Sequence, residues 1–144
     1  MTRVFPLAGL LRLRALAEER AAAELALARR EQASAEHRAR ETAERLSGAV
    51  MPAEGDHLAW HAAVAGRAAL GALLVERRTE VVHAQDASDD RAQTWTDARQ
   101  RVRALERLEE RHDEEQRAEE ARAEQKVLDE VAGRRAAEDR EVDR

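Results

Sequence analysis

Two histidines one helical turn apart come closer to a reactive site than any other residues of this chain. His57 and His61 stand four positions apart, and Glu54 and Asp56 come just before them. Imidazoles at this spacing on one helix face can bind zinc, with a carboxylate as a further ligand. The chain has no His-Glu-x-x-His sequence, however, and the pair lies beside a predicted turn. The pattern therefore favours no metal site.

The remaining polar residues form no catalytic arrangement. His37, His83 and His112 are scattered, and neither a Ser-His-Asp set nor a glycine-rich phosphate loop is present. The chain has no cysteine, which excludes disulfides, thiol catalysis and cysteine zinc sites and fits a reducing compartment. A pair of helices would also offer no concave pocket. We therefore predict a protein that is not an enzyme and needs no cofactor.

The composition is that of long helices. Of the 144 residues, 43% are apolar and 38% are charged, and only six glycines and two prolines interrupt them. Alanine supplies about half of the apolar residues, so few side chains are large enough for a layered globular core. One elongated all-α domain over residues 1–144 is expected, with disorder as the alternative.

Charge and hydropathy narrow the classes of partner. The net charge is −5 and no long basic face appears, which argues against nucleic acid binding. The apolar run from Val4 to Leu11 is interrupted by Arg12 and Arg14 and no small-residue cleavage site follows, so it is not a signal peptide. We expect no segment to approach the roughly 20 apolar residues that span a bilayer, and hence a soluble protein without membrane insertion.

Helix-breaking residues divide the chain into two predicted helices. Pro6 fits the start of a first helix over about residues 7–48, and the breakers between Ser47 and Asp56 place a turn at residues 49–56. A second helix is expected over about residues 57–134, followed by a disordered tail at residues 135–144. With the turn centred near residue 53, Leu7 should lie beside about residue 100, and Trp95 should pack over Leu11 to Leu16.

A heptad repeat on the second helix predicts how it packs. The positions at an average spacing of 3.5 residues from Leu70 to Leu105 are mostly apolar, as in a coiled-coil seam, with Arg77, Ser88 and Arg91 as the exceptions. Beyond Leu108 the same positions are polar or charged except for Ala123, so the second helix should overhang the first. The predicted fold class is an all-α antiparallel two-helix coiled coil, a helical hairpin with an overhanging C-terminal helix. The predicted coiled-coil core comprises Leu13, Leu16, Leu27, Val81, Trp95, Val102 and Leu105.

Four segments resemble those of a known family. They are Phe5-Pro6-Leu7 with Leu10, Leu11 and Arg14, then Gln93-Thr94-Trp95, then Leu105-Glu106-Arg107-Leu108-Glu109-Glu110-Arg111, and finally the Glu-Gln-Lys-x-x-Asp-Glu pattern of residues 124–130. The last of these is the most specific. Together with the chain length and the helix-turn-long-helix layout, they resemble FliJ, the coiled-coil component of the flagellar type III export apparatus.

The resemblance implies a role in flagellar protein export, and so in flagellum biogenesis and motility. It implies a fold similar to the gamma-subunit stalk of rotary ATPases. Such a stalk would promote the assembly and activity of the hexameric export ATPase FliI, contact the export gate protein FlhA and assist export chaperones, with FliH as a further candidate partner. The implied location is the cytoplasm, at the inner face of the cell membrane beneath the flagellum.

Two binding surfaces follow from the resemblance and from the apolar residues near its motifs. The ATPase-binding residues would be Leu7, Leu11, Arg14, Glu124, Gln125, Lys126, Val127, Leu128, Asp129, Glu130 and Val131. The gate-binding residues would be Leu70, Leu73, Leu74 and Arg77, in the most apolar run of the chain. Leu73 and Val75 fall outside the heptad, and the alternative is that they pack on Leu46 and Val50 of the first helix. For the whole chain, the alternative is a generic coiled-coil scaffold or a secretion chaperone that binds clients along its side.

Overall fold

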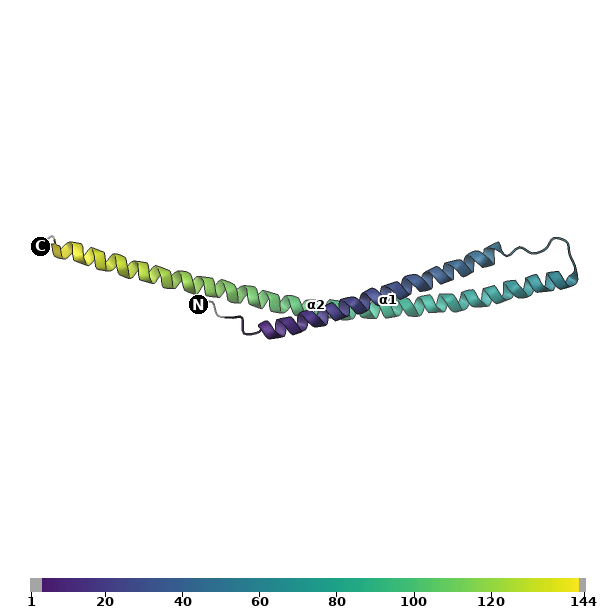
Figure 1. Cartoon of the computed structure of the whole chain (residues 1–144), viewed down its shortest axis with the longest axis horizontal. Helices are drawn as coiled ribbons and strands as arrows, with labels where there is room; N and C mark the ends of the chain where they lie inside the picture. The colour runs from purple at the N-terminus through teal and green to yellow at the C-terminus, as the bar shows by residue number, and fades with distance from the viewer. Residues whose placement is uncertain (1–3, 143–144) are drawn as a thin grey trace. The chain divides into compact units, whose positions relative to one another are not determined.

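The computed structural model describes the backbone of residues 4–142 and the side chains of residues 4–137, and within this range it has two α-helices and no strand (Figure 1). Helix α1 spans Ala8–Gly48 and helix α2 spans His57–Val142. The amide of Ala8 donates to the Phe5 carbonyl at 3.1 Å, which closes the first turn around Pro6. Pro6 fits here because an amide at a helix start has no intrahelical acceptor.

Helix α2 continues eight residues past its expected end at Arg134. Disorder was expected over residues 135–144, but residues 135–142 are helical, while residues 143 and 144 lie outside the described residues. Gly133 disfavours a helix by only about 1 kcal/mol relative to alanine. No proline follows it, and the pair of Glu130 with Arg134, 3.7 Å apart, bridges it on the helix surface. Good helix formers therefore carry the helix through this glycine.

The chain divides into two units, each with parts of both helices. One is Leu16–Arg99, and the other combines Met1–Ala15 with Gln100–Arg144. In the first, called the hairpin unit below, α1 and α2 run antiparallel and are joined by residues 49–56 (Figure 1). The predicted helical hairpin is confirmed, since the two long helices pack against each other.

The core of the hairpin unit is a narrow seam of small side chains on α1. The buried residues recur at intervals of three, four or seven, the period of a coiled coil. On α1 they are Ala21, Leu25, Ala28, Ala35 and Thr42. On α2 of this unit the buried positions are Leu74 and Ser88, and Leu70, Arg77, Val81, Ala84, Trp95 and Ala98 are half-buried. The heptad read from the sequence of α2 is therefore the one that faces α1.

The prediction of the core was wrong for the leucines of α1. Leu13, Leu16 and Leu27 are 62%, 54% and 54% exposed, respectively. Val102 and Leu105, by contrast, are only 4% and 9% exposed. The seam of α1 passes through alanines, so the larger leucines beside them project outside it. Small side chains allow the helix axes to approach closely, and size alone was a poor guide to burial here.

Ion pairs between the helices give the register of the hairpin unit. Arg99 pairs with Glu18 at 2.6 Å, Arg91 with Glu24 at 2.8 Å, and Arg38 with Glu80 at 3.4 Å. Trp95, between Arg91 and Arg99, therefore lies opposite the part of α1 near Ala21. The expected packing of Trp95 over Leu11 to Leu16 is wrong.

The linker at residues 49–56 explains the difference in register. Figure 1 shows it extending past the end of α1 toward the start of α2. An extended chain rises about 3.3 Å per residue, against 1.5 Å in a helix, so eight linker residues span more than three helical turns of α2. The first turns of α2 therefore project beyond α1. Arg67 secures this junction by donating to the carbonyls of Leu46 and Ala49 at the end of α1.

The second unit, called the end unit below, pairs the start of α1 with the middle of α2. The Phe5 ring lies 5.7 Å from the His112 ring, so Leu7 is placed near residue 110 rather than near residue 100. Val102 and Leu105 are its buried core, and the positions that continue their heptad, Glu109, His112 and Gln116, are half-buried. The seam therefore extends past Leu108, where it was expected to end. Every described side chain from residue 117 to residue 137 is exposed.

Candidate protein-docking surfaces

The free part of α2 carries one apolar face. Glu124, Val127, Leu128 and Val131 are spaced three or four residues apart, which places them on the same side of a helix. The three apolar side chains are 59%, 63% and 44% exposed. Ala123, Glu124, Val127 and Leu128 line a shallow hollow. A partner helix could bury this face without displacing any part of the chain.

Polar residues on the other sides of this segment pair along the helix. Gln125 donates to Asp129 at 2.7 Å, and Glu130 lies 3.7 Å from Arg134. Pairs at this spacing stabilise an exposed helix by about 0.2–0.5 kcal/mol each. They add to the helix propensity of the segment, whose apolar face is already formed for binding.

The N-terminal residues predicted for the same surface lie elsewhere in the end unit. Leu11 and Arg14 are half-buried, whereas Leu7 is 39% exposed. The contact of Phe5 with His112 places Leu7 beside about residue 110, which is roughly 21 Å along the helix from Glu124. The two groups of predicted residues do not form one contiguous patch. A single partner would have to be large enough to reach both.

The residues predicted to bind the export gate are partly in the core. Leu74 is only 8% exposed, and Leu70, Leu73 and Arg77 are half-buried. Val50, the alternative contact expected for Leu73 and Val75, is 85% exposed. A partner at this place would therefore touch the outer edges of Leu73 and Arg77 and the exposed side chains beside them.

The segment from Leu58 to Val75 is more apolar than expected. It contains one charged residue, Arg67, and α2 holds an 18-residue stretch with a mean hydropathy of 1.5, of which 6% is buried. The expectation that no segment approaches the hydropathy and length of a membrane span is wrong. Leu58 and Trp60, which precede the apolar run of residues 62–75 recognised in the sequence, are 75% and 48% exposed, and Val64 within that run is 39% exposed.

The histidine pair beside this segment makes aromatic contacts. The rings of His57 and His61 lie 6.0 Å apart and are stacked, and Trp60 meets the His61 ring edge-on at 5.5 Å. Among residues 4–137, no three side chains of the types that bind metals converge. The pair thus lies against Trp60 at the start of the apolar segment.

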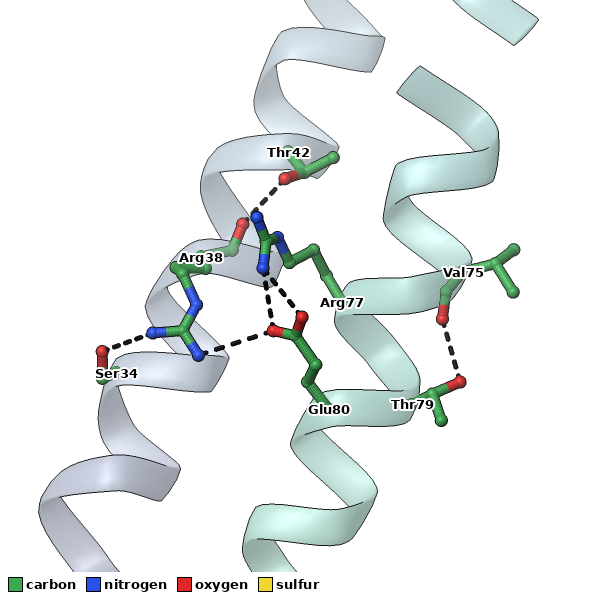
Figure 2. Close-up of polar contacts among 7 residues, drawn as sticks. All are labelled: Ser34, Arg38, Thr42, Val75, Arg77, Thr79 and Glu80. Carbon is green, nitrogen blue, oxygen red and sulfur yellow. Dashed lines mark hydrogen bonds and ion pairs between the residues drawn. The ribbon is translucent and has the colours of Figure 1, made fainter. Parts of the chain in front are cut away.

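A polar network connects α1 and α2 around Arg77, which occupies a core position of the α2 heptad. Arg77 donates to both carboxylate oxygens of Glu80 at 2.8 and 2.9 Å, and Arg38 of α1 reaches the same carboxylate at 3.4 Å (Figure 2). Ser34 accepts a hydrogen bond from Arg38, and Thr42 donates to the Arg38 carbonyl (Figure 2). The half-buried Arg77 is thereby neutralised inside the seam.

Glu80 gives the hairpin a specific pH dependence. The hydrogen bond from Arg77, helped by Arg38, lowers the pKa of Glu80 below its ordinary value. A lowered carboxylate pKa stabilises the fold above the pKa of the unfolded chain, and this stabilisation disappears as the pH falls through the folded-state value. Replacing Arg77 with methionine should raise the pKa of Glu80, as measured by NMR titration of its side-chain carboxyl carbon. An unchanged pKa would contradict the network, and Arg78→Met is the neighbouring control.

The chain matches a known protein family over nearly its whole length. A family model described as the flagellar FliJ protein matches residues 3–141, nearly the whole chain. The chain belongs to the FliJ family. The resemblance read from its segments is thus confirmed. No curated protein and no solved structure matches the chain significantly.

Membership of the FliJ family gives the two surfaces their context. FliJ proteins serve flagellar protein export, so this chain has a role in that process and associates with the flagellar export apparatus. The family is of the stalk or chaperone type and is not a known enzyme family. The exposed faces of α2 are accordingly candidates for contacts with other export components.

Proposed function

We propose that this FliJ protein is the coiled-coil stalk that binds the hexameric export ATPase FliI through the free C-terminal part of α2. The observation that carries the proposal is the apolar face of Val127, Leu128 and Val131, on a helix segment that no other part of the described chain covers. A helix with one apolar face docks into a groove through residues at these intervals. The specific Glu-Gln-Lys-x-x-Asp-Glu pattern occupies the same turns.

The size of this face suits a contact that forms and breaks. Complete burial of one valine or leucine side chain is worth about 1.5–3 kcal/mol, and part of this is offset by the entropy lost on association. Three partly exposed side chains surrounded by charged residues therefore support binding of moderate strength. Such a contact could promote ring assembly and ATPase activity without locking the ring to the stalk.

We place the contact with the export gate protein FlhA on the hairpin unit, around Leu70, Leu73, Leu74 and Arg77. Its accessible part is the edge of Leu73 and Arg77 together with the 64% exposed side chain of Val75. The hairpin contact and the ATPase contact lie in different units, so one chain could serve both partners. The proposal places the protein in the cytoplasm at the base of the flagellum, with FliH and export chaperones as further partners.

Truncation before Glu124 tests the ATPase contact. No described side chain beyond Gln116 is buried, so the shortened chain should keep its helical hairpin and its thermal unfolding midpoint. We expect the full chain to stimulate the turnover and ring formation of the export ATPase from the same cell, and the truncated chain to do neither. Turnover can be measured by phosphate release and ring formation by electron microscopy.

The opposite result would favour a different function. Equal stimulation by the full and truncated chains would place the ATPase contact outside the C-terminal segment. If neither chain affected the ATPase while both were helical and folded, the chain would instead be a scaffold or a secretion chaperone that binds clients along its side.

A further inference from the structure

Helix α2 of the hairpin unit carries a second heptad seam that α1 does not cover. Its members alternate at intervals of three and four residues, as the positions of a coiled-coil contact do. They are His61, Val64, Ala68, Gly71, Val75, Arg78 and Val82. The three valines are 39%, 64% and 56% exposed. Apolar residues at helical intervals normally face another helix. Their exposure means that the second seam has no such partner among the residues that the structure describes.

Packing within the chain does not require a glycine at position 71, in the middle of the second seam. A Cβ atom built there would meet no atom within 4 Å. Glycine inside a helix nevertheless costs about 0.8–1.0 kcal/mol relative to alanine. Together with Ala68 it leaves a low point in the seam, into which a larger side chain of another helix could fit.

The second seam is complementary to itself when a second copy runs antiparallel. With residue 73 at the centre, Gly71 lies opposite Val75 of the second copy, and Ala68 lies opposite Arg78. Val64 lies opposite Val82 in the same register, and each large side chain near the centre meets a small one. We propose that the second seam binds a second copy of this chain, with the two α2 helices packed antiparallel.

Charge favours the antiparallel orientation. Near its far end the segment is acidic, with Asp86, Asp89 and Asp90, whereas α2 has no acidic residue in its first turn. The N-terminus of a helix carries a partial positive charge that attracts carboxylates. An antiparallel copy sets His57 and the helix start opposite Asp89, but a parallel copy would set the aspartates against each other.

The size of the second seam indicates a reversible dimer. Three exposed valines and the stem of Arg78 form a contact smaller than that of permanent dimers, which bury more than about 2,000 Å². The dimer should therefore dissociate on dilution. Val75 and its neighbours also border the surface proposed for the export gate, so the dimer and the gate contact would exclude each other. The dimer proposal does not depend on the gate contact.

Sedimentation velocity of the full chain over a wide concentration range tests the dimer. We expect the sedimentation coefficient to rise with concentration for the natural chain and to stay at the monomer value for Val75→Asp. Leu27→Asp, which places the same charge on an exposed side chain of α1, is the matched control and should dimerise. Both variants should remain helical, which circular dichroism checks. A natural chain that is monomeric throughout, or a Val75→Asp chain that still dimerises, would overturn the proposal.

Cysteine pairs test the register, because the chain has no cysteine of its own. A mixture of a Val64→Cys chain and a Val82→Cys chain of different tag length should form a mixed disulfide on mild oxidation. Either chain alone should not, since identical positions would be roughly 27 Å apart, far beyond the reach of a disulfide. Disulfides formed by Val64→Cys alone would show a parallel pairing and overturn the antiparallel dimer.

Lipid is the other occupant that the apolar segment could take. Flotation with vesicles of phosphatidylcholine and phosphatidylglycerol distinguishes lipid binding from dimer formation. We expect the chain to stay in the bottom fraction and not to float with the vesicles. Flotation of a chain that is monomeric in solution, abolished by Val75→Asp, would overturn the dimer and assign the second seam to the membrane surface.

Discussion

Leu25→Ala is expected to lower the free energy of unfolding of the hairpin unit by about 2–5 kcal/mol. Leu25 is the only large apolar side chain among the buried residues of α1, and it is 5% exposed. Its neighbours in the seam are alanines, which cannot move far enough to fill the space that its side chain leaves. Urea unfolding followed by far-ultraviolet circular dichroism measures the change.

Leu27→Ala is the matched control, two positions along the same helix. It removes the same atoms from a side chain that is 54% exposed, so it should cost about 0.5 kcal/mol or less. Equal losses for the two variants would contradict the seam of α1. A larger loss of unfolding free energy for Leu27→Ala than for Leu25→Ala would instead support the leucine core predicted from the sequence.

Val127→Asp combined with Leu128→Asp is expected to weaken binding to the export ATPase about a hundredfold or more, the equivalent of roughly 2.7 kcal/mol. Two carboxylates would replace the centre of the proposed contact and would have to be desolvated on binding. The thermal unfolding midpoint should not change, because both side chains are more than half exposed. Isothermal titration or surface plasmon resonance measures the affinity.

Ala118→Asp combined with Ala121→Asp is the control for charge. It adds the same two negative charges to the same exposed segment, but outside the turns of Val127 and Leu128. We expect it to bind within about threefold of the natural chain, since exposed charges interact weakly. If both double variants lost binding equally, net charge rather than the apolar face would govern the contact.

The seam of α2 could be predicted because its residues differ sharply in size and polarity. Val102 lies between Arg101 and Arg103, and Leu105 is followed by Glu106 and Arg107, so their period is visible in the sequence and their burial follows from it. The seam of α1 could not be read in this way. Alanine is common on every side of α1, and nothing local separates the buried Ala28 from the exposed Ala26.

The register depended on the linker, whose conformation the sequence does not reveal. A compact turn centred near residue 53 would have paired Leu7 with residue 100. The extended linker moves this pairing by about ten residues, so that Phe5 meets His112. The same shift places Glu109, His112 and Gln116 on the seam, where their polarity had suggested the end of the contact. Local pattern thus predicted the elements, while the geometry of one connection decided which residues meet.

The docking faces were only partly visible in the sequence. Val127 and Leu128 stood out because charged residues surround them, and their exposure agrees with a surface role. Leu58, Trp60 and Val64 did not, because an apolar run is equally typical of a core. Their exposure follows from the projection of α2 beyond α1, which is again a property of the linker.

The alanines of α1 have a consequence for sliding between the helices. Ala21, Ala28 and Ala35 repeat every seven residues, so a shift of α1 by one heptad would bring alanine to the positions of alanine and preserve the interhelix distance. What such a shift would destroy is the fit of Leu25 and the alignment of Glu18 with Arg99 and of Glu24 with Arg91. The repeat therefore sets how far apart the helices lie, whereas one leucine and a few surface ion pairs select their offset along the axis.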